Sequence, residues 1–438
     1  MRCERLTLGD AAAAGVAADI RKLVPPPESV RDAVALIIAT VRTGGDRAVR
    51  DYSRSLDTQG REPQALVVSD DELDAALGAL DPAVRHGIER AIANVEAVAG
   101  AHKPGGVGGA PITELGGNRV IHRDAPVERA AIYVPGGRAP YPSTVVMGTV
   151  PARLAGVGHI AVCSPPRADG DLDPVVLAAC RLAGVHAVYR MGGAHAIAAL
   201  AYGTESVPAV DVIVGPGNLY VQEAKRQVFG QVGIDGFAGP SDLLVIATGD
   251  VDPEPLALDL LAQAEHGPGT LVVAASNAEN LLDAFEKHLA RGAETGAVAC
   301  LVAASGPDHL LALAQAFAPE HLQLVGAEAE ALAGRVTRAG CLFVGAGAGT
   351  AFGDYIAGSN HILPTNGAAR FASAVSPEHF MRRFSEVHIG DPGTLVQSAA
   401  PLARAEGFEL HARSMEARIK RESTAAPGGG AVGDNGSR

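Results

Sequence analysis

Short apolar runs rich in Val, Ile and Leu alternate with longer, helix-like stretches from about residue 128 onward. The helix-like stretches include 143–156, 174–184, 218–230 and 253–267. Strands that alternate with helices of this length are typical of βαβ units, so the pattern predicts an α/β fold with mainly parallel sheets. Nine of the short runs have the length and composition of buried strands: 129–134, 159–164, 186–191, 211–215, 242–247, 270–275, 300–304, 321–325 and 341–345.

The regions outside this alternation indicate how the chain is divided. Residues 28–100 have a mainly helical pattern, and Ser69 with Glu72 three positions later forms a capping-box sequence at the start of one helix. The turn-rich segment 236–242 is the predicted boundary between two α/β domains, because nine strands would make one very large sheet. After about residue 375 the pattern becomes helical again.

Charge and cysteine content argue against several classes of protein. The chain has 36 Lys and Arg against 49 Asp and Glu, a formal net charge of −13, which disfavours nucleic acid or an anionic membrane as the main partner. Its five cysteines include no Cys-x-x-Cys pair, which disfavours a disulfide framework and a cysteine zinc site. The first residues lack the apolar run of a signal peptide, and Pro151, Arg153 and His159 interrupt the longest apolar stretch. We therefore expect a cytoplasmic globular protein with no membrane segment.

Three glycine-rich segments, at 133–140, 191–196 and 214–218, each follow a predicted strand and precede a predicted helix. Glycine lets the backbone approach a ligand closely, and the N-terminus of the following helix favours a phosphate. None of the three has the G-x-G-x-x-G spacing, and no acidic residue follows at the distance usual for a ribose contact. By pattern alone they are either tight turns or parts of a dinucleotide site.

A second group of polar residues has the chemistry of a metal or acid–base site. Gln263 and His266 lie three positions apart on one predicted helix and can point to one spot. Oxygen and imidazole donors without thiolates suit Zn²⁺ or another divalent metal in an open catalytic site. Other polar residues in apolar or glycine-rich settings, where burial without partners is costly, are Glu320, His321, Asp354, His361 and His411.

Glu320 and His321 are adjacent, so on a regular strand their side chains would face opposite ways. Pro319 makes a bend possible that would turn both toward one pocket. The alternative from the pattern alone is a helix-capping Glu beside a surface His.

Eight segments of the chain have the character of motifs: YVPGGRAPYPSTVVMGTVPARLAG, GGAHAIAALAYGTESVP, VGPGNLYVQEAKRQV, GIDGFAGPSDLLV, LLAQAEHGP, APEHL, GDYIAGSNHILPT and AEGFELHA. Together they resemble the histidinol dehydrogenase family. They stand in the order that the family has and extend over nearly the whole chain, from about residue 25 to 420. Chance agreement of all eight is negligible, so the resemblance is specific.

The resemblance implies a fold and an activity. Members of that family have two Rossmann-like α/β domains with parallel sheets, and they oxidise L-histidinol through L-histidinal to L-histidine, the last step of L-histidine biosynthesis. They use two NAD⁺ in succession and one Zn²⁺ per subunit, and they are homodimers whose sites are completed in trans. The parts expected here are a helical segment (1–24), an α/β domain with most zinc and catalytic residues (25–131 and 241–375), an α/β domain binding NAD (132–240), a helical dimerisation segment (376–422) and a disordered tail (423–438).

Matched position by position, the resemblance also assigns roles to residues. His321 would remove the hydroxyl proton of the alcohol, and Glu320 would activate water against the aldehyde. The zinc ligands by match are Gln263, His266, Asp354 and His411. The substrate contacts by match are these four, His321, Ser241, His361 and Glu406. The cofactor contacts by match are Tyr133, His195 and Asn218.

Two positions depart from the family pattern, and two alternatives stay open. His195 stands where the family usually has Gln, and Asp242 stands where Glu is commoner. One alternative is a paralogous zinc- and NAD-dependent dehydrogenase of another small alcohol, such as sulfopropanediol, although His361 and Glu406 favour histidinol. The other is a catalytically inactive paralogue that acts as a binding subunit, against which the intact matched positions argue.

Overall fold

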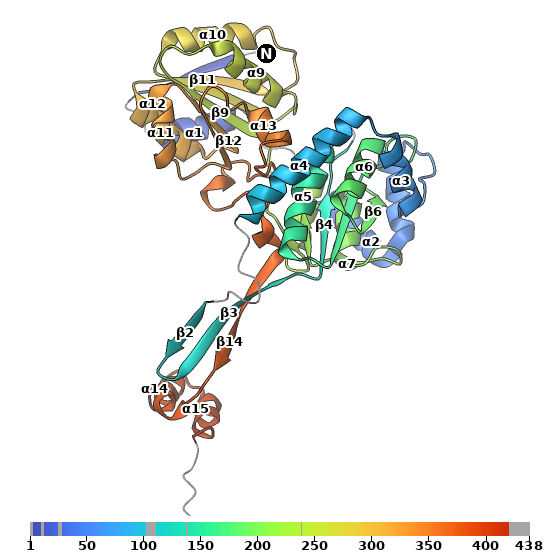
Figure 1. Cartoon of the computed structure of the whole chain (residues 1–438), viewed down its shortest axis with the longest axis vertical. Coiled ribbons are helices and arrows are strands. Elements are labelled where there is room, and N and C mark those ends of the chain that lie inside the picture. The colour runs from blue at the N-terminus through green and yellow to red at the C-terminus, as the bar shows by residue number, and fades with distance from the viewer. Residues whose placement is uncertain are drawn as a thin grey trace, which may run out of the picture. The chain divides into compact units, whose positions relative to one another are not determined.

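The computed structural model describes residues 3–9, 13–24, 29–101, 111–136, 139–237 and 239–419. Two compact units make up the chain (Figure 1): a larger one of Met1–Pro104 and Pro126–Arg382, and a smaller one of Gly105–Ala125 and Arg383–Arg438. Both parallel sheets belong to the larger unit. Within the described ranges, no helix combines the length and the apolar character that crossing a bilayer requires.

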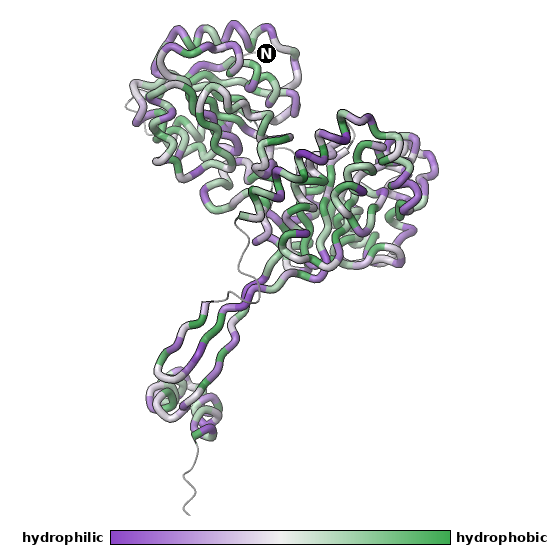
Figure 2. Tube along the Cα trace, in the orientation of Figure 1, coloured by the Kyte–Doolittle hydropathy of each residue, from purple (hydrophilic) through white to green (hydrophobic). Residues whose placement is uncertain are grey.

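The first parallel sheet has six strands in the order β1-β11-β10-β9-β12-β13. Leu244 and Ile246 of β9 pack with helices α1 and α11 on one face, and Leu243 and Val245 pack with α9 and α10 on the other. Because helices cover both faces, inner strands such as β9 and β10 are nearly continuous apolar runs. Figure 2 shows the hydropathy along the chain. The strands are β1 (Cys3–Leu8), β9 (Asp242–Ala247), β10 (Leu271–Ser276), β11 (Val298–Ala304), β12 (His321–Val325) and β13 (Cys341–Val344). The helices are α1 (Ala13–Lys22), α9 (Pro253–Ala264), α10 (Glu279–Leu289), α11 (Pro307–Phe317), α12 (Ala327–Glu330) and α13 (Thr350–Tyr355). The 3₁₀ turns η2 (Ala333–Arg335) and η3 (Ala368–Arg370) follow in the chain, and a further 3₁₀ turn, η4 (Pro377–Phe380), packs on α5 (Pro142–Ala155) beside the second sheet.

The second parallel sheet has five strands in the order β6-β5-β4-β7-β8. Ala130 and Ile132 of β4 pack with α3 to α6, whereas Ala131 and Tyr133 pack with α2, α7 and α8. The strands are β4 (Arg129–Tyr133), β5 (His159–Ser164), β6 (Ala187–Arg190), β7 (Val212–Val214) and β8 (Gly233–Ile234). The helices are α2 (Arg31–Tyr52) with the π-helical turn η1 (Ser53–Asp57), α3 (Asp70–Ala79), α4 (Pro82–Gly100), α5 (Pro142–Ala155), α6 (Pro174–Ala183), α7 (Gly193–Tyr202) and α8 (Leu219–Val228). All nine predicted strands are therefore present, and the α/β prediction is confirmed.

The smaller unit combines an antiparallel hairpin with two helices. Its strands are β2 (Ile112–Leu115), β3 (Asn118–Pro126) and β14 (Met381–His388), in the sheet order β14-β3-β2. Gly116 and Gly117 form the two-residue turn between β2 and β3 with φ values of 57° and 84°, as a primed hairpin turn requires. Helices α14 (Pro392–Ala405) and α15 (Glu409–Glu416) pack through a small core of Val396, Ala400 and Ala412.

Three expectations about the parts of the chain are wrong. The expected helical segment 1–24 is helical only in its second part, α1, since residues 3–8 form an edge strand parallel to β11, where polar side chains are tolerated. The helices of residues 31–100 cover the second sheet rather than the first, with α2 on α7 and α8, α3 on α6 and α4 on α5. A helical pattern shows which face is apolar, but it does not show which sheet that face covers. The segment 376–422 is not helical throughout, since β14 lies in it. The predicted tail 423–438 lies outside the described residues.

Candidate active site

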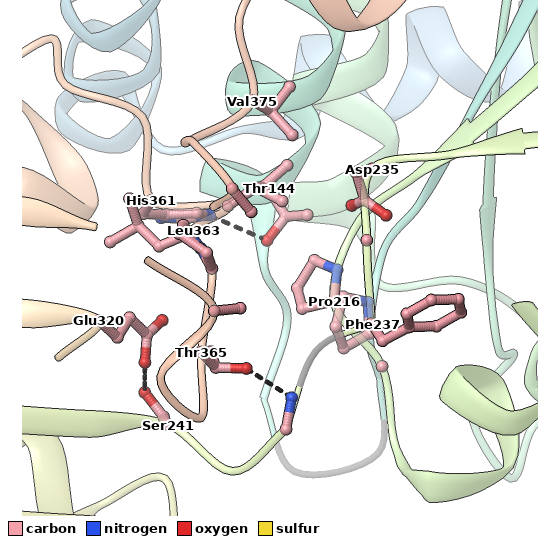
Figure 3. Close-up of a pocket in the computed structure, with 18 of the residues that line it drawn as sticks. Thr144, Pro216, Asp235, Phe237, Ser241, Glu320, His361, Leu363, Thr365 and Val375 are labelled. Atoms are coloured by element: carbon pink, nitrogen blue, oxygen red, sulfur yellow. Dashed lines mark hydrogen bonds between the residues drawn. The ribbon is translucent and has the colours of Figure 1, made fainter. Parts of the chain in front are cut away.

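A cavity of about 690 Å³ in the larger unit collects most of the residues that the sequence singled out (Figure 3). One wall comes from the second sheet, where Pro135 follows β4 and Pro216 to Asn218 follow β7. β4 and β7 are neighbours at the point where the strand order reverses, which is the usual ligand position at the carboxyl ends of a parallel sheet. The opposite wall comes from the first sheet and includes Ser241, Glu320 and His321.

The first sheet contributes its amino edge rather than its carboxyl edge. Ser241 directly precedes β9, Glu320 directly precedes β12, and His321 is the first residue of β12. β9 and β12 are parallel neighbours with His321 opposite Leu243, so Glu320 comes beside Asp242. The Asp242 Oδ1 atom accepts the Glu320 backbone N–H at 2.7 Å, and Glu320 Oε2 accepts the Asp242 N–H at 3.0 Å. The Ser241 hydroxyl donates to the same Glu320 oxygen, as Figure 3 shows.

His321 lies between two carboxylates in this buried wall. Its Nδ1 is 3.8 Å from Glu320 Oε2, and its Nε2 is 3.6 Å from Asp354 Oδ1. Burial lowers the pKa of His321, but the charges of Glu320 and Asp354 outweigh burial and raise the pKa to about 9. Burial raises the pKa of Glu320 to about 7, although the charge of His321 opposes it. The pKa of the Glu320 carboxyl and the pKa of the His321 imidazole therefore both lie above their ordinary values.

Two of the three predicted metal ligands of the larger unit, Gln263 and His266, lie in contact, and the charge of the third, Asp354, acts on His266. The Gln263 amide nitrogen is 3.3 Å from His266 Nδ1 and also donates to the Ser241 hydroxyl. Burial lowers the pKa of His266, and the Asp354 charge acts on this imidazole in the opposite direction. Burial raises the pKa of Asp354, but the hydrogen bond and charge of His321 leave it below its ordinary value. A neutral imidazole, an ionised carboxylate and an amide are the donor types and protonation states that an open zinc site takes.

These donors fit a zinc ion only as an incomplete set. Within the described residues, no group of three or more His, Cys, Asp and Glu side chains is arranged to hold a metal. The fourth predicted ligand, His411, lies in α15 of the smaller unit, and the predicted substrate contact Glu406 ends α14 of the same unit. Of the four predicted ligands, Gln263, His266 and Asp354 belong to the larger unit, and His411 belongs to the smaller unit.

His361 joins the two sheets across the cavity. Its Nδ1 is 2.9 Å from the carbonyl oxygen of Asp354, so this nitrogen carries the hydrogen. Its Nε2 then accepts from the Thr144 hydroxyl at 3.2 Å, as Figure 3 shows. Burial lowers the pKa of His361, which keeps the ring neutral and suits an acceptor role.

The three predicted cofactor residues have different positions. Asn218 lines the cavity and also caps α8, because its Oδ1 accepts the Val221 N–H at 3.1 Å. Tyr133 is buried outside the lining, and its hydroxyl oxygen accepts the Gly193 N–H at 3.0 Å. His195 is also buried outside the lining, with Nε2 at 3.2 Å from the Ser53 hydroxyl. The cofactor roles of these residues stay predictions.

Sequence reasoning missed a buried ion pair that supports the glycine-rich turn after β7. Lys225 Nζ donates to Asp235 Oδ1 at 2.5 Å and to the Gly215 carbonyl at 2.6 Å, while Asp235 Oδ2 accepts the Gly215 N–H at 2.7 Å. Gly215 has a φ of 117°, and a Cβ there would lie 2.1 Å from the Tyr133 carbonyl oxygen. The spacing of Lys225 from Val221 and Val228 placed it on the buried helix face and could have revealed the pair.

A cavity between a parallel sheet with glycine-rich turns and a set of buried acid–base side chains defines a class of protein, an α/β enzyme that transforms a small molecule. Comparison with known proteins then gives the family. The chain belongs to the histidinol dehydrogenase family, because the sequence profile of that family matches residues 25–419.

Individual relatives agree with this assignment. Histidinol dehydrogenase of Parasynechococcus marenigrum is 44% identical over 405 residues, which cover 90% of this chain and 92% of the relative. Histidinol dehydrogenase of Rhodospirillum rubrum is 43% identical over 408 residues, covering 90% and 93%. The crystal structure of histidinol dehydrogenase from Elizabethkingia anophelis matches with a TM-score of 0.87 and 30% identity, over 95% of this chain and 98% of that one. The predicted family is confirmed, and the alternative of a paralogue for another alcohol is not favoured.

Proposed function

We propose that this chain is a zinc- and NAD-dependent histidinol dehydrogenase that oxidises L-histidinol by way of L-histidinal to L-histidine, the last step of L-histidine biosynthesis. The observation that carries the proposal is the buried group of Glu320, His321 and Asp354 on the wall of a cavity whose other wall is a glycine-rich strand end. Membership of the histidinol dehydrogenase family supports the choice of substrate.

The side chains of the cavity have the properties that two successive oxidations need. His321 lies between two carboxylates, so a proton that its imidazole takes from the substrate hydroxyl is stabilised there. Glu320 can exchange a proton near neutral pH, because burial raises its pKa to about 7, and it can therefore act as the base toward water in the aldehyde step. When bound, zinc would polarise the substrate oxygen, and NAD would accept hydride. Gln263, His266 and Asp354, with His411, would hold the zinc ion.

Polar residues that line the cavity, including Ser241 and His361, would orient the substrate. Ser241 lies within reach of both Glu320 and Gln263, so its hydroxyl links the water-activating and metal-holding parts of the site. His361 and Glu406 are the proposed contacts to the polar groups of histidinol. Tyr133, His195 and Asn218 are the proposed contacts to NAD.

We further propose a cytoplasmic homodimer in which the smaller unit completes the partner's site. The buried core of this unit is small, whereas several of its large apolar side chains are exposed, including Phe384, Val387, Leu402, Phe408 and Leu410. Exposed apolar side chains at this density mark a protein interface. His411 and Glu406 belong to the same unit, so the contact that covers these side chains would also carry both residues into a site.

The test is NADH formation by purified protein with L-histidinol, before and after treatment with a strong chelator. We expect turnover that the chelator abolishes and that Zn²⁺ restores, since the predicted ligands are oxygen and imidazole donors without thiolates. Full turnover by protein shown to be metal-free would contradict the zinc assignment. If the protein oxidises a small alcohol without an imidazole and leaves histidinol unreacted, the proposed substrate is wrong.

A further inference from the structure

One arginine at the end of α1 connects several segments behind the candidate site. Arg21 Nη1 donates to Asp242 Oδ2 at 3.1 Å, and its Nη2 donates to the Phe317 carbonyl oxygen at 2.7 Å. Its guanidinium carbon lies 4.1 Å from the centre of the Phe317 ring. Nη1 is also 3.4 Å from Asn366 Oδ1, in the residue next to Thr365 of the cavity lining. A planar fork of donors can serve these partners together, which a single ammonium group cannot do.

Asp242 binds both Arg21 and Glu320. Its side chain is only 1% exposed, and a carboxylate so deeply buried is costly unless a cation pairs with it. Arg21 pairs with Oδ2, while Oδ1 accepts the backbone N–H of Glu320 at 2.7 Å. The two oxygens of one carboxylate therefore join the guanidinium to the backbone of the proposed water-activating residue.

The second contact of Arg21 holds the turn that leads into Glu320. Phe317 is the last residue of α11, and Ala318 follows it with a φ of 47°, which side-chain-bearing residues rarely adopt. Such a conformation persists only where the surrounding contacts hold it. Arg21 donates a hydrogen bond to the Phe317 carbonyl oxygen at the start of this turn, and Asp242 accepts one from the Glu320 N–H at its end.

We propose that Arg21 is a positioning residue of the active site, which holds Glu320 in place for the aldehyde step by way of Asp242 and the turn at 317–320. This inference rests on the function proposed above. Arg21 does not line the cavity, so it acts through Asp242 and the backbone and not by touching the substrate. Its loss should therefore slow the aldehyde step more than the alcohol step and leave substrate binding nearly unchanged.

The test compares Arg21→Ala, Arg21→Lys and the control Lys22→Ala in full-length protein. Lys22 is the neighbouring cation on α1, and it forms an exposed ion pair with Asp19 at 2.8 Å. The measurements are kcat and KM for L-histidinol and for supplied L-histidinal, together with amide hydrogen exchange of the segment 317–325. For Arg21→Ala we expect kcat for histidinal to fall about 10- to 100-fold, because small misplacements of a reacting group cost this much.

The remaining expectations separate positioning from a general loss of structure. KM for NAD⁺ should stay within about threefold of the wild-type value, exchange at 317–325 should accelerate, and Arg21→Lys should recover part of kcat. Lys22→Ala should match the wild type throughout. If Arg21→Ala does not fold, Arg21→Gln takes its place in every comparison.

Two results would overturn the inference: unchanged kcat for histidinal in the Arg21 variants, or an equal fall in both half-reactions with unchanged exchange at 317–325. If the wild type oxidises neither histidinol nor histidinal, the proposed function is refuted, but the role of Arg21 is not yet decided. The exchange measurement still decides about Arg21 in that case, because faster exchange than in Lys22→Ala supports the link to Glu320 and equal exchange refutes it.

Discussion

Ala318 takes its left-handed conformation directly before Pro319, and this turn sets the direction in which the next two side chains leave the backbone. Left-handed backbone costs an L-residue roughly 1 to 2 kcal/mol. In return, Glu320 stands before the first residue of β12 and His321 begins the strand, so both line one cavity instead of facing opposite ways. The bend that Pro319 made possible in the sequence is therefore present, and two adjacent residues share one pocket.

A division of labour between these neighbours can be tested with two substitutions. His321→Ala should slow oxidation of histidinol, and Glu320→Gln should mainly slow oxidation of supplied histidinal, each by about 10²- to 10⁴-fold, the usual loss for a general base. Single-turnover assays of the two half-reactions measure the effects separately. His309→Ala is the control and should change neither, because this exposed histidine has a surface hydrogen bond with Ser305 and does not line the cavity. Equal defects of both variants in both half-reactions would refute the separation.

How far the site could be predicted depends on whether a residue belongs to a local motif. Glu320 and His321 lie in one short segment, and their neighbours in the pocket come from others that the sequence also marked as polar in apolar surroundings. Arg21 could not be found in this way, because it stands 221 positions from Asp242 in a segment without any motif. Contacts of that range depend on the tertiary fold, which local patterns do not specify.

Secondary-structure elements were predictable where burial made their pattern strong. Strands covered by helices on both faces, such as β9 and β10, are continuous apolar runs and were found from the sequence. The hairpin strands β2 and β3 and the strand β14 are largely exposed, so their apolar positions are few and were missed. The consecutive Gly116 and Gly117 were the one strong signal for a hairpin there.

Asn218 caps the start of α8 and is also a proposed contact to NAD. Asn218→Ala removes the acceptor for the Val221 N–H, so we expect about 1 kcal/mol lower stability and a lower Tm. Asn218→Asp keeps a capping acceptor but adds a negative charge beside the proposed cofactor, so Tm should stay and KM for NAD⁺ should rise. Differential scanning calorimetry and steady-state kinetics measure the two effects. If Asn218→Ala and Asn218→Asp lower Tm by the same amount, the capping role of the side chain is contradicted.

The start of α3 should make stability depend on pH. The Glu72 carboxylate accepts the Ser69 N–H at 2.8 Å and pairs with the buried Arg190 at 2.6 Å. The Ser69 backbone hydrogen bond is the main cause that lowers the pKa of Glu72 below its ordinary value. A carboxyl with a lowered folded pKa stabilises the fold above its unfolded pKa, and this stability is lost as pH falls through the folded pKa.

Glu72→Gln should accordingly lower Tm at pH 7, and the difference from the wild type should shrink as the pH falls below about 4.5. The control Glu89→Gln changes an exposed ion pair with Arg85 on α4 and should have only a small effect. Thermal unfolding across this pH range measures the difference. A Tm difference that stays constant down to the acid limit would show that the Glu72 charge does not carry the stabilisation.

At the scale of the whole molecule, one wrong prediction concerned which sheet the helices of residues 31–100 cover. The amphipathic helices of residues 31–100 have clear apolar faces, but either sheet offered a surface for them. The structure places them on the second sheet, where α2 covers α7 and α8. The smaller unit has several large apolar side chains exposed, and the proposed dimer would cover them.

The last prediction tests whether that partner is a second copy of this chain. His321→Ala alters the larger unit and His411→Ala alters the smaller one, so each variant alone should be inactive. If the smaller unit of one subunit completes the site of the other, a heterodimer of the two variants contains one site with both histidines intact. We expect about half of the wild-type activity per heterodimer after subunit exchange, measured on heterodimers purified through two different affinity tags.

The matched control mixes His321→Ala with His266→Ala, which both alter the larger unit. No heterodimer of that pair contains an intact site, whichever subunit supplies His411, so this mixture should stay inactive. Recovery in the first mixture without recovery in the second can arise only from sites shared between subunits. If neither mixture regains activity although heterodimers form, each chain completes its own site and the shared arrangement is refuted.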